Sequence, residues 1–302
     1  MNSGFAAGGM KMGEQASVVQ DPQVELVQTD HENNINDCQF DFYGTCLASC
    51  DSNGFLQITT LKNGKQEEPV TFKVHEGPVW QVAWAHPKYE SVIATCGYDN
   101  RVKVFKREQN NSWTEIFQDN LDSSVNCIAW APWEYGLILA AGTAQGRIVI
   151  FQKGGDDKLQ RIHDFVAHKE GVNGISWGPS TEPAVLMSSV QSSDDKCEVM
   201  PEKFKLPVKR LVSGGNDKAV MVWEFFDSSE SPKGTKIGEH ADWVRDVAWC
   251  SNIGLLHETI ASCSEDCTAR VWRHVVDKEG SNWVPKEVKI SEKIPLWKVS
   301  WS

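Results

Sequence analysis

The fold is decided by HADWVRDVAWCSNIGLLHETIASCSEDCTARVW at residues 240–272. Its first part, VRDVAW (244–249), fits the pattern apolar-x-x-apolar-x-Trp. Its second part, IASCSEDCTARVW (260–272), has apolar runs on either side of a short polar turn. Two such runs joined by a tight turn are typical of a β-hairpin. The stretch therefore predicts a unit of antiparallel strands.

Both patterns recur along the chain. The first ends at Phe40, Trp84, Trp130, Trp177, Trp249 and Trp301, so its intervals are 44, 46, 47, 72 and 52 residues. The second recurs without a gap at 47–59, 93–105, 139–151, 211–223 and 260–272. A repeat of about 45 residues built from short strands is the spacing of a four-stranded propeller blade. We therefore predict an all-β propeller.

A set of polar residues repeats at fixed positions in three units. A histidine precedes the first strand, a Ser or Thr lies in the second strand, an aspartate lies in the turn, and an aromatic residue ends the hairpin. Buried groups of this kind need hydrogen-bond partners, so we predict a structural network that ties each outer loop to its hairpin. The predicted members are His75, Thr95 and Asp99, then His168, Ser213, Asp217 and Trp223, and finally His240, Ser262, Asp266 and Trp272.

Two units depart from this set. The first has Asn53 and Thr59 where aspartate and tryptophan are expected, and the third has Leu121 and Gln145 in place of histidine and aspartate. We expect apolar packing to hold these two blades.

The repeats predict the domain boundaries. Residues 1–22 are expected to be a disordered tail, and residues 180–208 an inserted surface loop. The remainder accounts for five blades and the start of a sixth, so either the chain is truncated or another chain completes the ring. The predicted spans are about 23–62, 70–108, 114–153, 160–227 and 235–275 for blades one to five, and about 282–302 for the start of blade six.

Composition excludes several kinds of function. The net charge of −11 and the pI near 5.2 argue against a nucleic-acid binder and against docking on anionic lipid. No apolar run is long enough to span a membrane, and no secretory signal is evident.

The nine cysteines form no C-x-x-C pair, so we predict no metal site and no cofactor. No G-x-S-x-G, H-E-x-x-H or P-loop sequence occurs, so we predict that the protein is not an enzyme.

Three stretches closely resemble one branch of the WD-repeat family. This branch contains the small propellers shared by the outer coat of COPII vesicles and the Y-shaped scaffold of the nuclear pore; a sister propeller of the pore scaffold is a near alternative. The resemblance runs from about residue 24 to 302. The stretches are HEGPVWQVAWAHPKYESVIATCGYDNRVKVF (75–105), SSVNCIAWAPWEYGLILAAGTAQG (123–146) and HADWVRDVAWCSNIGLLHETIASCSED (240–266).

The resemblance implies an open six-bladed propeller that takes a seventh blade from an α-solenoid partner. That partner would be the large COPII outer-coat subunit or a Y-complex nucleoporin, and a nutrient-signalling coat-like complex is also implied. The expected locations are cytoplasmic COPII coats at ER exit sites and the nuclear pore. We expect the edge that receives the partner to include Val24, Leu26, Gln57, Ile58, Trp297 and Val299.

A second interpretation stays open, in which a closed propeller reads a peptide or ligase substrate on its top face. Trp80, Trp243 and Trp297 would then line the mouth of the channel. Ring closure separates the two interpretations, because a self-sufficient reader needs a complete last blade from its own chain.

Overall fold

The computed structural model describes residues 27–301 with seven gaps, at 63–64, 156–157, 181–207, 226–230, 252–254, 278–279 and 291–292, and without residue 289. The predicted tail and most of the predicted insertion lie outside the described residues. In the described part of the chain the elements are strands, apart from the short 3₁₀ turns η1 (Pro87–Tyr89) and η2 (Trp133–Tyr135). No helix there is long and apolar enough to cross a membrane.

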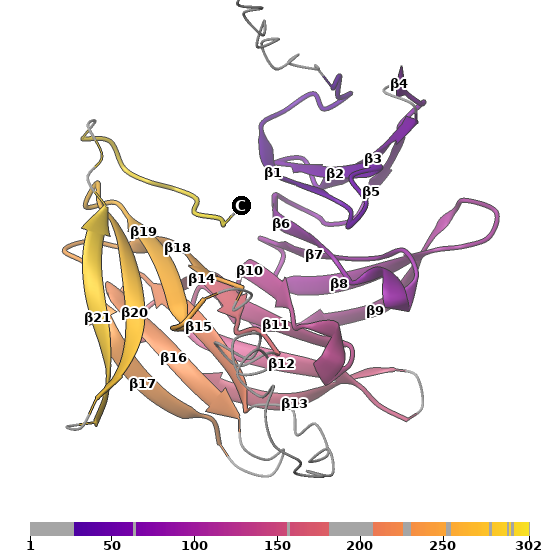
Figure 1. Cartoon of the computed structure of the whole chain (residues 1–302). Helices are drawn as coiled ribbons and strands as arrows, with labels where there is room; N and C mark the ends of the chain where they lie inside the picture. Colours follow the sequence, from indigo (N-terminus) through magenta and orange to yellow (C-terminus); the bar gives the residue numbers. More distant parts are fainter. Residues whose placement is uncertain are drawn as a thin grey trace, which may run out of the picture.

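The strands form five antiparallel sheets, which are the blades of a β-propeller (Figure 1). Blade one holds β1 (Ile35–Phe40), β2 (Cys46–Asp51), β3 (Phe55–Lys62), β4 (Lys65–Gln66) and β5 (Val70–Lys73). Blade two holds β6 (Val79–Trp84), β7 (Val92–Gly97), β8 (Arg101–Arg107) and β9 (Trp113–Asn120), and blade three holds β10 (Val125–Trp130), β11 (Ile138–Thr143), β12 (Arg147–Lys153) and β13 (Leu159–Val166). Blade four holds β14 (Val172–Trp177), β15 (Lys209–Gly215), β16 (Ala219–Phe225) and β17 (Lys233–Glu239), and blade five holds β18 (Val244–Trp249), β19 (Thr259–Ser264), β20 (Ala269–Asp277) and β21 (Gly280–Val288).

The predicted blade boundaries are displaced by one strand. Residues 70–73, for example, pair with β3 in blade one, although they were assigned to blade two. Likewise β21, expected within blade six from residue 282, pairs with β20 and completes blade five. The reason is geometric: a tight hairpin joins each outer strand to the sheet before it, while the following connection crosses to the next blade. Sequence periodicity fixes the length of the repeat but not the strand at which a sheet begins.

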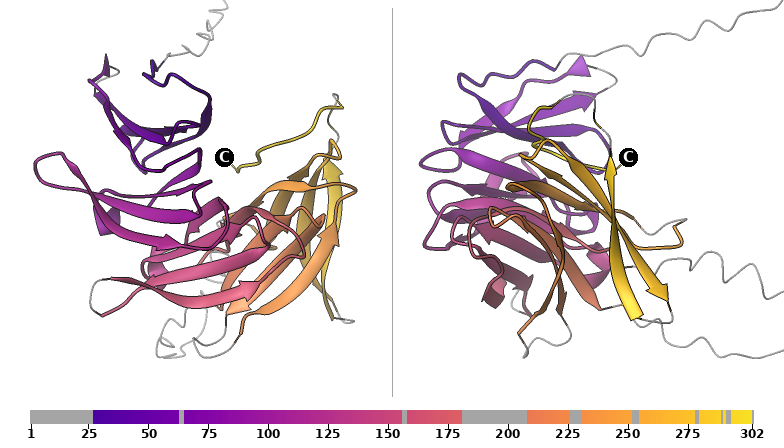
Figure 2. Two further views of the ribbon diagram at one scale, coloured as in Figure 1. Left: turned by 180° about the vertical axis from the view of Figure 1, so that it is seen from behind. Right: turned by 90° about the vertical axis from the view of Figure 1, so that its left-hand side faces the viewer.

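The inner strands pack side by side around a central channel in the order β1, β6, β10, β14 and β18 (Figure 2). Indole groups link neighbouring inner strands. The Nε1 of Trp130 donates to the carbonyl of Ala83 in the preceding blade at 3.0 Å, and the Nε1 of Trp177 donates to Ala129 O at 3.0 Å. In blades three and four the terminal tryptophan of the first motif therefore donates a hydrogen bond to the preceding blade, whereas the indole nitrogen of Trp249 is buried without a hydrogen-bond partner among the described residues.

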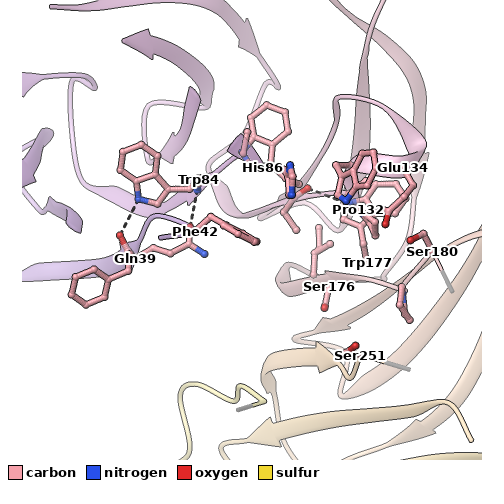
Figure 3. A pocket seen from close by; sticks show the side chains of 18 residues that line it. Gln39, Phe42, Trp84, His86, Pro132, Glu134, Ser176, Trp177, Ser180 and Ser251 are labelled. Atoms are coloured by element: carbon pink, nitrogen blue, oxygen red, sulfur yellow. Dashed lines mark hydrogen bonds between the residues drawn. The ribbon is translucent and has the colours of Figure 1, made fainter. Parts of the chain in front are cut away.

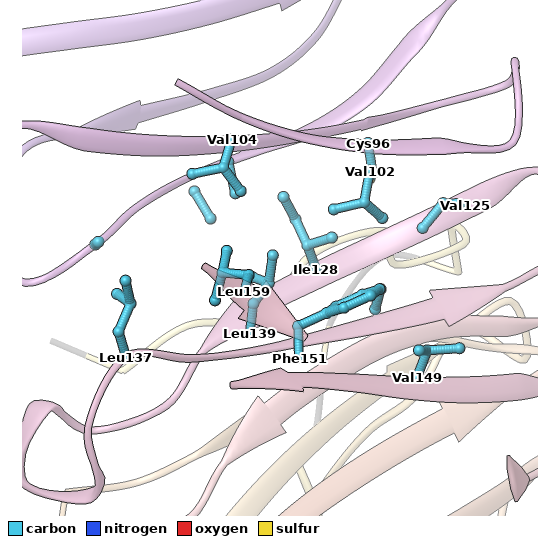
Figure 4. Packing of buried hydrophobic residues seen from close by; sticks show 14 of the residues in the cluster. Cys96, Val102, Val104, Val125, Ile128, Leu137, Leu139, Val149, Phe151 and Leu159 are labelled. Carbon is cyan, nitrogen blue, oxygen red and sulfur yellow. The ribbon is translucent and has the colours of Figure 1, made fainter. Parts of the chain in front are cut away.

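The core lies between the sheets, because each sheet buries its faces against its neighbours. Figure 4 shows the layer between blades two and three, where Val102 and Val104 meet Ile128, Leu139 and Phe151. Similar layers lie between blades one and two, three and four, and four and five. A blade thus depends on its neighbours for most of its apolar burial.

The opening between blades five and one contains the last described segment of the chain, residues 293–301, which belongs to no sheet (Figure 1). It runs beside blade five: Leu296 N donates to Ser264 O of β19 at 3.1 Å, and Trp301 Nε1 donates to Ala248 O of β18 at 3.0 Å. The segment thus occupies the place of a sixth inner strand, while six complete blades remain a prediction.

Gly214 provides a test of blade-to-blade packing. A Cβ built at this residue would lie 2.4 Å from Val244 Cγ1 and 3.0 Å from Val247 Cγ1 of blade five. We expect Gly214→Ala to lower the free energy of unfolding by about 1–3 kcal/mol, because the added methyl overpacks this contact. Urea unfolding measures the change. Gly155→Ala is the control, since nothing lies within 4 Å of that position; equal effects of the two substitutions would contradict the packing.

Candidate functional site

The polar residues singled out in blade five form one chain of hydrogen bonds. His240 Nδ1 lies 3.0 Å from Asp266 Oδ2, and His240 Nε2 lies 2.7 Å from Ser262 Oγ. Trp272 Nε1 donates to the same Ser262 hydroxyl at 2.8 Å. Because a carboxylate only accepts, Nδ1 carries the proton and Nε2 accepts from the serine. The imidazole, the serine hydroxyl and the indole N–H of this network thus each have a hydrogen-bond partner.

Blades four and two repeat this arrangement. In blade four, His168 lies 2.8 Å from Asp217 and 2.7 Å from Ser213, to which Trp223 donates at 2.9 Å. In blade two, His75 lies 2.8 Å from Asp99 and 2.9 Å from Thr95. Phe105 ends that hairpin, so no indole joins the network.

Serine, histidine and aspartate also make up the triad of many hydrolases. In this protein, however, the serine is not placed where a nucleophile would have to be. Ser213 and Ser262 are completely buried, so their hydroxyls are closed to a substrate. Each hydroxyl also accepts an indole N–H while it donates to histidine. We therefore infer that the three networks are structural.

The carboxylates of these networks are held in the charged form. Burial by itself would raise the pKa of Asp266, but hydrogen bonds from Thr268, Ala241 N and His240 together lower it to about 2. The pKa of Asp99 is also lowered to about 2, since His75 and the N–H groups of Glu76 and Arg101 outweigh its burial. Bonds to the ionised form are the physical cause in both cases.

Blade one contains a network that the sequence analysis missed. His31 Nδ1 lies 2.9 Å from Asp51 Oδ2, and its Nε2 lies 2.8 Å from Ser49 Oγ. Apolar packing, the main support expected for this blade, is thus joined by a polar network whose carboxylate comes from a position two residues before Asn53. The signal was the histidine: it lies four residues before the first strand in blades one, two, four and five.

In blade three, Leu121 and Gln145 occupy the positions of histidine and aspartate. Leu121 is buried in the layer shared with blade two, and Gln145 is exposed. No comparable chain of hydrogen bonds occurs among the described residues of this blade, so apolar contacts take its place there.

The residues expected at the partner edge are scattered. Val24 and Leu26 lie outside the described residues. Gln57 and Ile58 are wrong as edge residues, because β3 lies inside the sheet between β2 and β5, and both side chains are buried. Trp297 is 61% exposed beside the opening, and Val299 N donates to Asp246 Oδ2 at 3.1 Å.

The opening is flanked by exposed apolar side chains. On blade one, Ile35 and Phe40 of β1 are 45% and 48% exposed. On the far side, blade five and the last segment expose Val284, Val288, Ile294 and Trp297. Neighbouring exposed apolar groups on two sides of one opening are typical of an interaction surface.

Residues 27–34 lie on blade one itself. Gln28 N donates to Gln66 Oε1 at 3.0 Å, Asp30 N donates to Gln57 Oε1 at 2.9 Å, and His31 joins the network already described. Residues 27–34 are therefore bonded to the sheet of blade one, and they do not add an outer strand to the sheet of blade five.

Aromatic residues gather at both mouths of the channel. At one mouth the Arg245 guanidinium lies 5.0 Å from the ring centre of Trp243 and 4.4 Å from that of Trp297, while Trp80 Nε1 donates to Ser124 Oγ at 3.0 Å. At the other, loops of several blades enclose a hollow of about 570 Å³, shown in Figure 3. There His86 stacks on Trp133 with ring centres 5.5 Å apart.

Phe42 also packs against His86, with ring centres 5.3 Å apart, which extends the aromatic rim of this hollow to blade one. The sequence analysis did not identify the rim, because its members come from separate loops. Among the described residues, no group of three potential ligands is placed to hold a metal ion.

These observations define the class: the chain is a WD-repeat β-propeller. The family model for the WD domain, G-beta repeat, matches residues 24–58, 66–106 and 231–273. The chain is 37% identical to the protein transport protein SEC13 of Cryptococcus neoformans var. neoformans serotype D (strain JEC21) over 300 residues, which are 91% of this chain and 87% of that protein.

Two further relatives agree. The chain is 37% identical to the SEC13 homolog of Drosophila melanogaster, with 92% of this chain and 75% of the relative covered. It is 34% identical to the protein transport protein sec13 of Emericella nidulans, with 90% and 85% covered. The chain belongs to the SEC13 family of WD-repeat proteins.

The networks can be tested one residue at a time. We expect Asp266→Ala to lower the free energy of unfolding by about 1–3 kcal/mol, because buried donors lose their acceptor. Asp217→Ala should behave alike. The control is Gln145→Ala, at the same turn position in the blade without a network. Chemical denaturation gives the values, and wild-type stability of both aspartate variants would rule the networks out as stabilising elements.

The network of blade five also predicts a dependence on pH. The pKa of Asp266 falls from 3.8 to about 2 on folding, so its contribution is complete above about pH 4 and is lost as the pH falls toward 2. The stability difference between wild type and Asp266→Asn should therefore shrink over that range. Thermal unfolding from pH 6 to pH 2.5 measures the difference, and a difference that does not change with pH would contradict the assignment.

Proposed function

We propose that the chain is a non-enzymatic scaffold subunit of a protein transport coat, of the COPII type that carries cargo from the ER to the Golgi. Its relatives carry the name protein transport protein SEC13. In this proposal the protein adds stiffness to an elongated α-solenoid partner, which contributes a β-blade to the propeller. The same role extends the proposal to the Y-shaped scaffold of the nuclear pore.

The observation that carries the proposal is the use of residues 27–34. Propellers are usually closed when the N-terminal strand completes the last blade. In this chain, by contrast, the stretch is hydrogen-bonded to blade one through Gln28, Asp30 and His31. In the described part of the chain this segment thus joins no strand of blade five, which supports a ring that its own N-terminal segment does not close.

The two sides of the opening suit a β-strand ligand. Main-chain groups at a strand edge supply a ladder, and the exposed Ile35, Phe40, Val284 and Val288 supply apolar area for burial. A blade contributed by a partner would use both, and it would also cover surface that otherwise favours aggregation.

A second candidate function is favoured by the aromatic hollow of Phe42, His86 and Trp133. In that case the propeller reads a peptide on a face of the ring. The two proposals differ in which surface a partner needs, so substitutions at the opening separate them.

We expect Ile35→Glu with Phe40→Glu to reduce recovery of an α-solenoid partner at least tenfold, because charges on β1 oppose strand addition. The chain is purified from its native source, and the partner is quantified by mass spectrometry. Ile116→Glu is the matched control, since Ile116 is also 45% exposed but lies on β9, away from the opening.

Normal recovery with the β1 variant, together with wild-type stability of that variant, would contradict insertion at the opening. Loss of partners through Phe42→Ala or Trp133→Ala instead would favour the peptide reader.

A further inference from the structure

The second residue of each inner strand contacts the inner strand that follows it around the ring. Three of these residues are asparagines, and each donates its side-chain N–H to the carbonyl of the first residue of the next inner strand. The bonds run from Asn36 to Val79 O at 2.8 Å, from Asn126 to Val172 O at 3.1 Å, and from Asn173 to Val244 O at 2.8 Å. One repeat position thus joins blades one, three and four to the blades that follow them.

In blades two and five the same position holds a larger side chain. Trp80 Nε1 donates to Ser124 Oγ at 3.0 Å, and Ser124 immediately precedes β10. The Arg245 guanidinium lies 4.4 Å from the ring centre of Trp297, which is the second residue of the motif that ends the chain. The second position therefore reaches the next inner strand in all five blades, whatever residue occupies it.

Arg245 is itself fixed within blade five. Its Nε donates to Glu265 Oε1 at 2.9 Å, and its guanidinium lies 5.0 Å from the ring centre of Trp243. The face of an indole attracts a cation, so Arg245 favours one orientation of Trp297. The backbone agrees with this, because Leu296 N donates to Ser264 O of the same blade at 3.1 Å. Trp297 is thus oriented by blade five before a partner binds.

Trp297 occupies the position that reaches the following blade, but the opening lies there instead. Figure 2 shows the last segment turning inward between blades five and one. The Trp297 side chain is 61% exposed although Arg245 lies against its ring. Its Nε1 has no hydrogen-bond partner in the part of the chain that the structure describes. Exposed tryptophans held in one orientation are the side chains that most often dominate the affinity of an interface.

We propose that Trp297 is the main contact of the last segment with the partner's blade, and that Arg245 and Glu265 are positioning residues for it. The occupant is an extended strand that runs beside the last segment. It carries a hydroxyl or carbonyl acceptor at, or just before, its first residue, and Trp297 Nε1 donates to this acceptor as Trp80 Nε1 donates to Ser124. This inference rests on the proposed function, since it names a contact that the partner's blade makes.

Amide hydrogen exchange of the purified chain tests the positioning role. We expect Arg245→Met to speed exchange of residues 296–301 roughly tenfold, because the segment loses a contact with blade five. Arg245→Lys keeps the charge and should restore part of the protection. Lys293→Met is the control, because it removes an exposed lysine from the same segment. Wild-type exchange in Arg245→Met would overturn the positioning role.

Recovery of the partner from the native source tests the contact itself. We expect Trp297→Ala to reduce recovery of an α-solenoid chain at least tenfold. Trp297→Phe keeps a ring but loses the N–H, so it should reduce recovery about threefold. Tyr98→Ala is the matched control, since Tyr98 is 63% exposed but lies on blade two. Urea unfolding should give all three variants wild-type stability, so that a loss of recovery reports the contact.

The outcomes separate this inference from the proposed function. Normal recovery with Trp297→Ala, when Ile35→Glu with Phe40→Glu abolishes recovery, would overturn the contact and leave insertion at the opening intact. Normal recovery with both variants would overturn the proposed function as well. Wild-type recovery with Trp297→Phe would overturn the hydrogen bond to the partner.

Discussion

Burial of each sheet against the next is the constraint on which the rest of this structure depends. A four-stranded sheet of this size has two faces to cover, and the apolar layers lie between sheets rather than within them. Val102 of blade two and Leu139 of blade three, for example, belong to one such layer. A propeller built this way is stable in its interior and incomplete wherever the series of blades is interrupted.

Two kinds of polar bond add specificity to that packing. Indole groups such as Trp130 Nε1 link one inner strand to the next, and the histidine networks link each outer loop to its own hairpin. Both are directional, so they fix the register of sheets that apolar contacts alone would leave free to slide. At the opening the same indole bond recurs, since Trp301 Nε1 of the last segment donates to Ala248 O of blade five.

The sequence predicted the class of fold because the repeats are local. A hairpin such as 260–272 forms from neighbouring residues, and its period survives insertions elsewhere. The network of blade one was missed because Asp51 reaches the histidine from a shifted position, which changes the pattern but not the chemistry. Gln57 and Ile58 were misplaced because the pairing of β5 with β3 is not apparent in periodicity. The aromatic hollow is lined by loops from several blades, and these loops come together only in the assembled ring.

Cross-linking mass spectrometry of the native complex tests the central claim most directly. Short amine- and carboxyl-reactive reagents would report which residues of a partner lie beside Asp37 and Glu32 on blade one, and beside Lys293 and Lys298 on the last segment. If a partner completes the propeller, one short segment of a long α-solenoid chain will cross-link to both sides of the opening. Cross-links confined to the loops around Trp133, with none at the opening, would contradict the account.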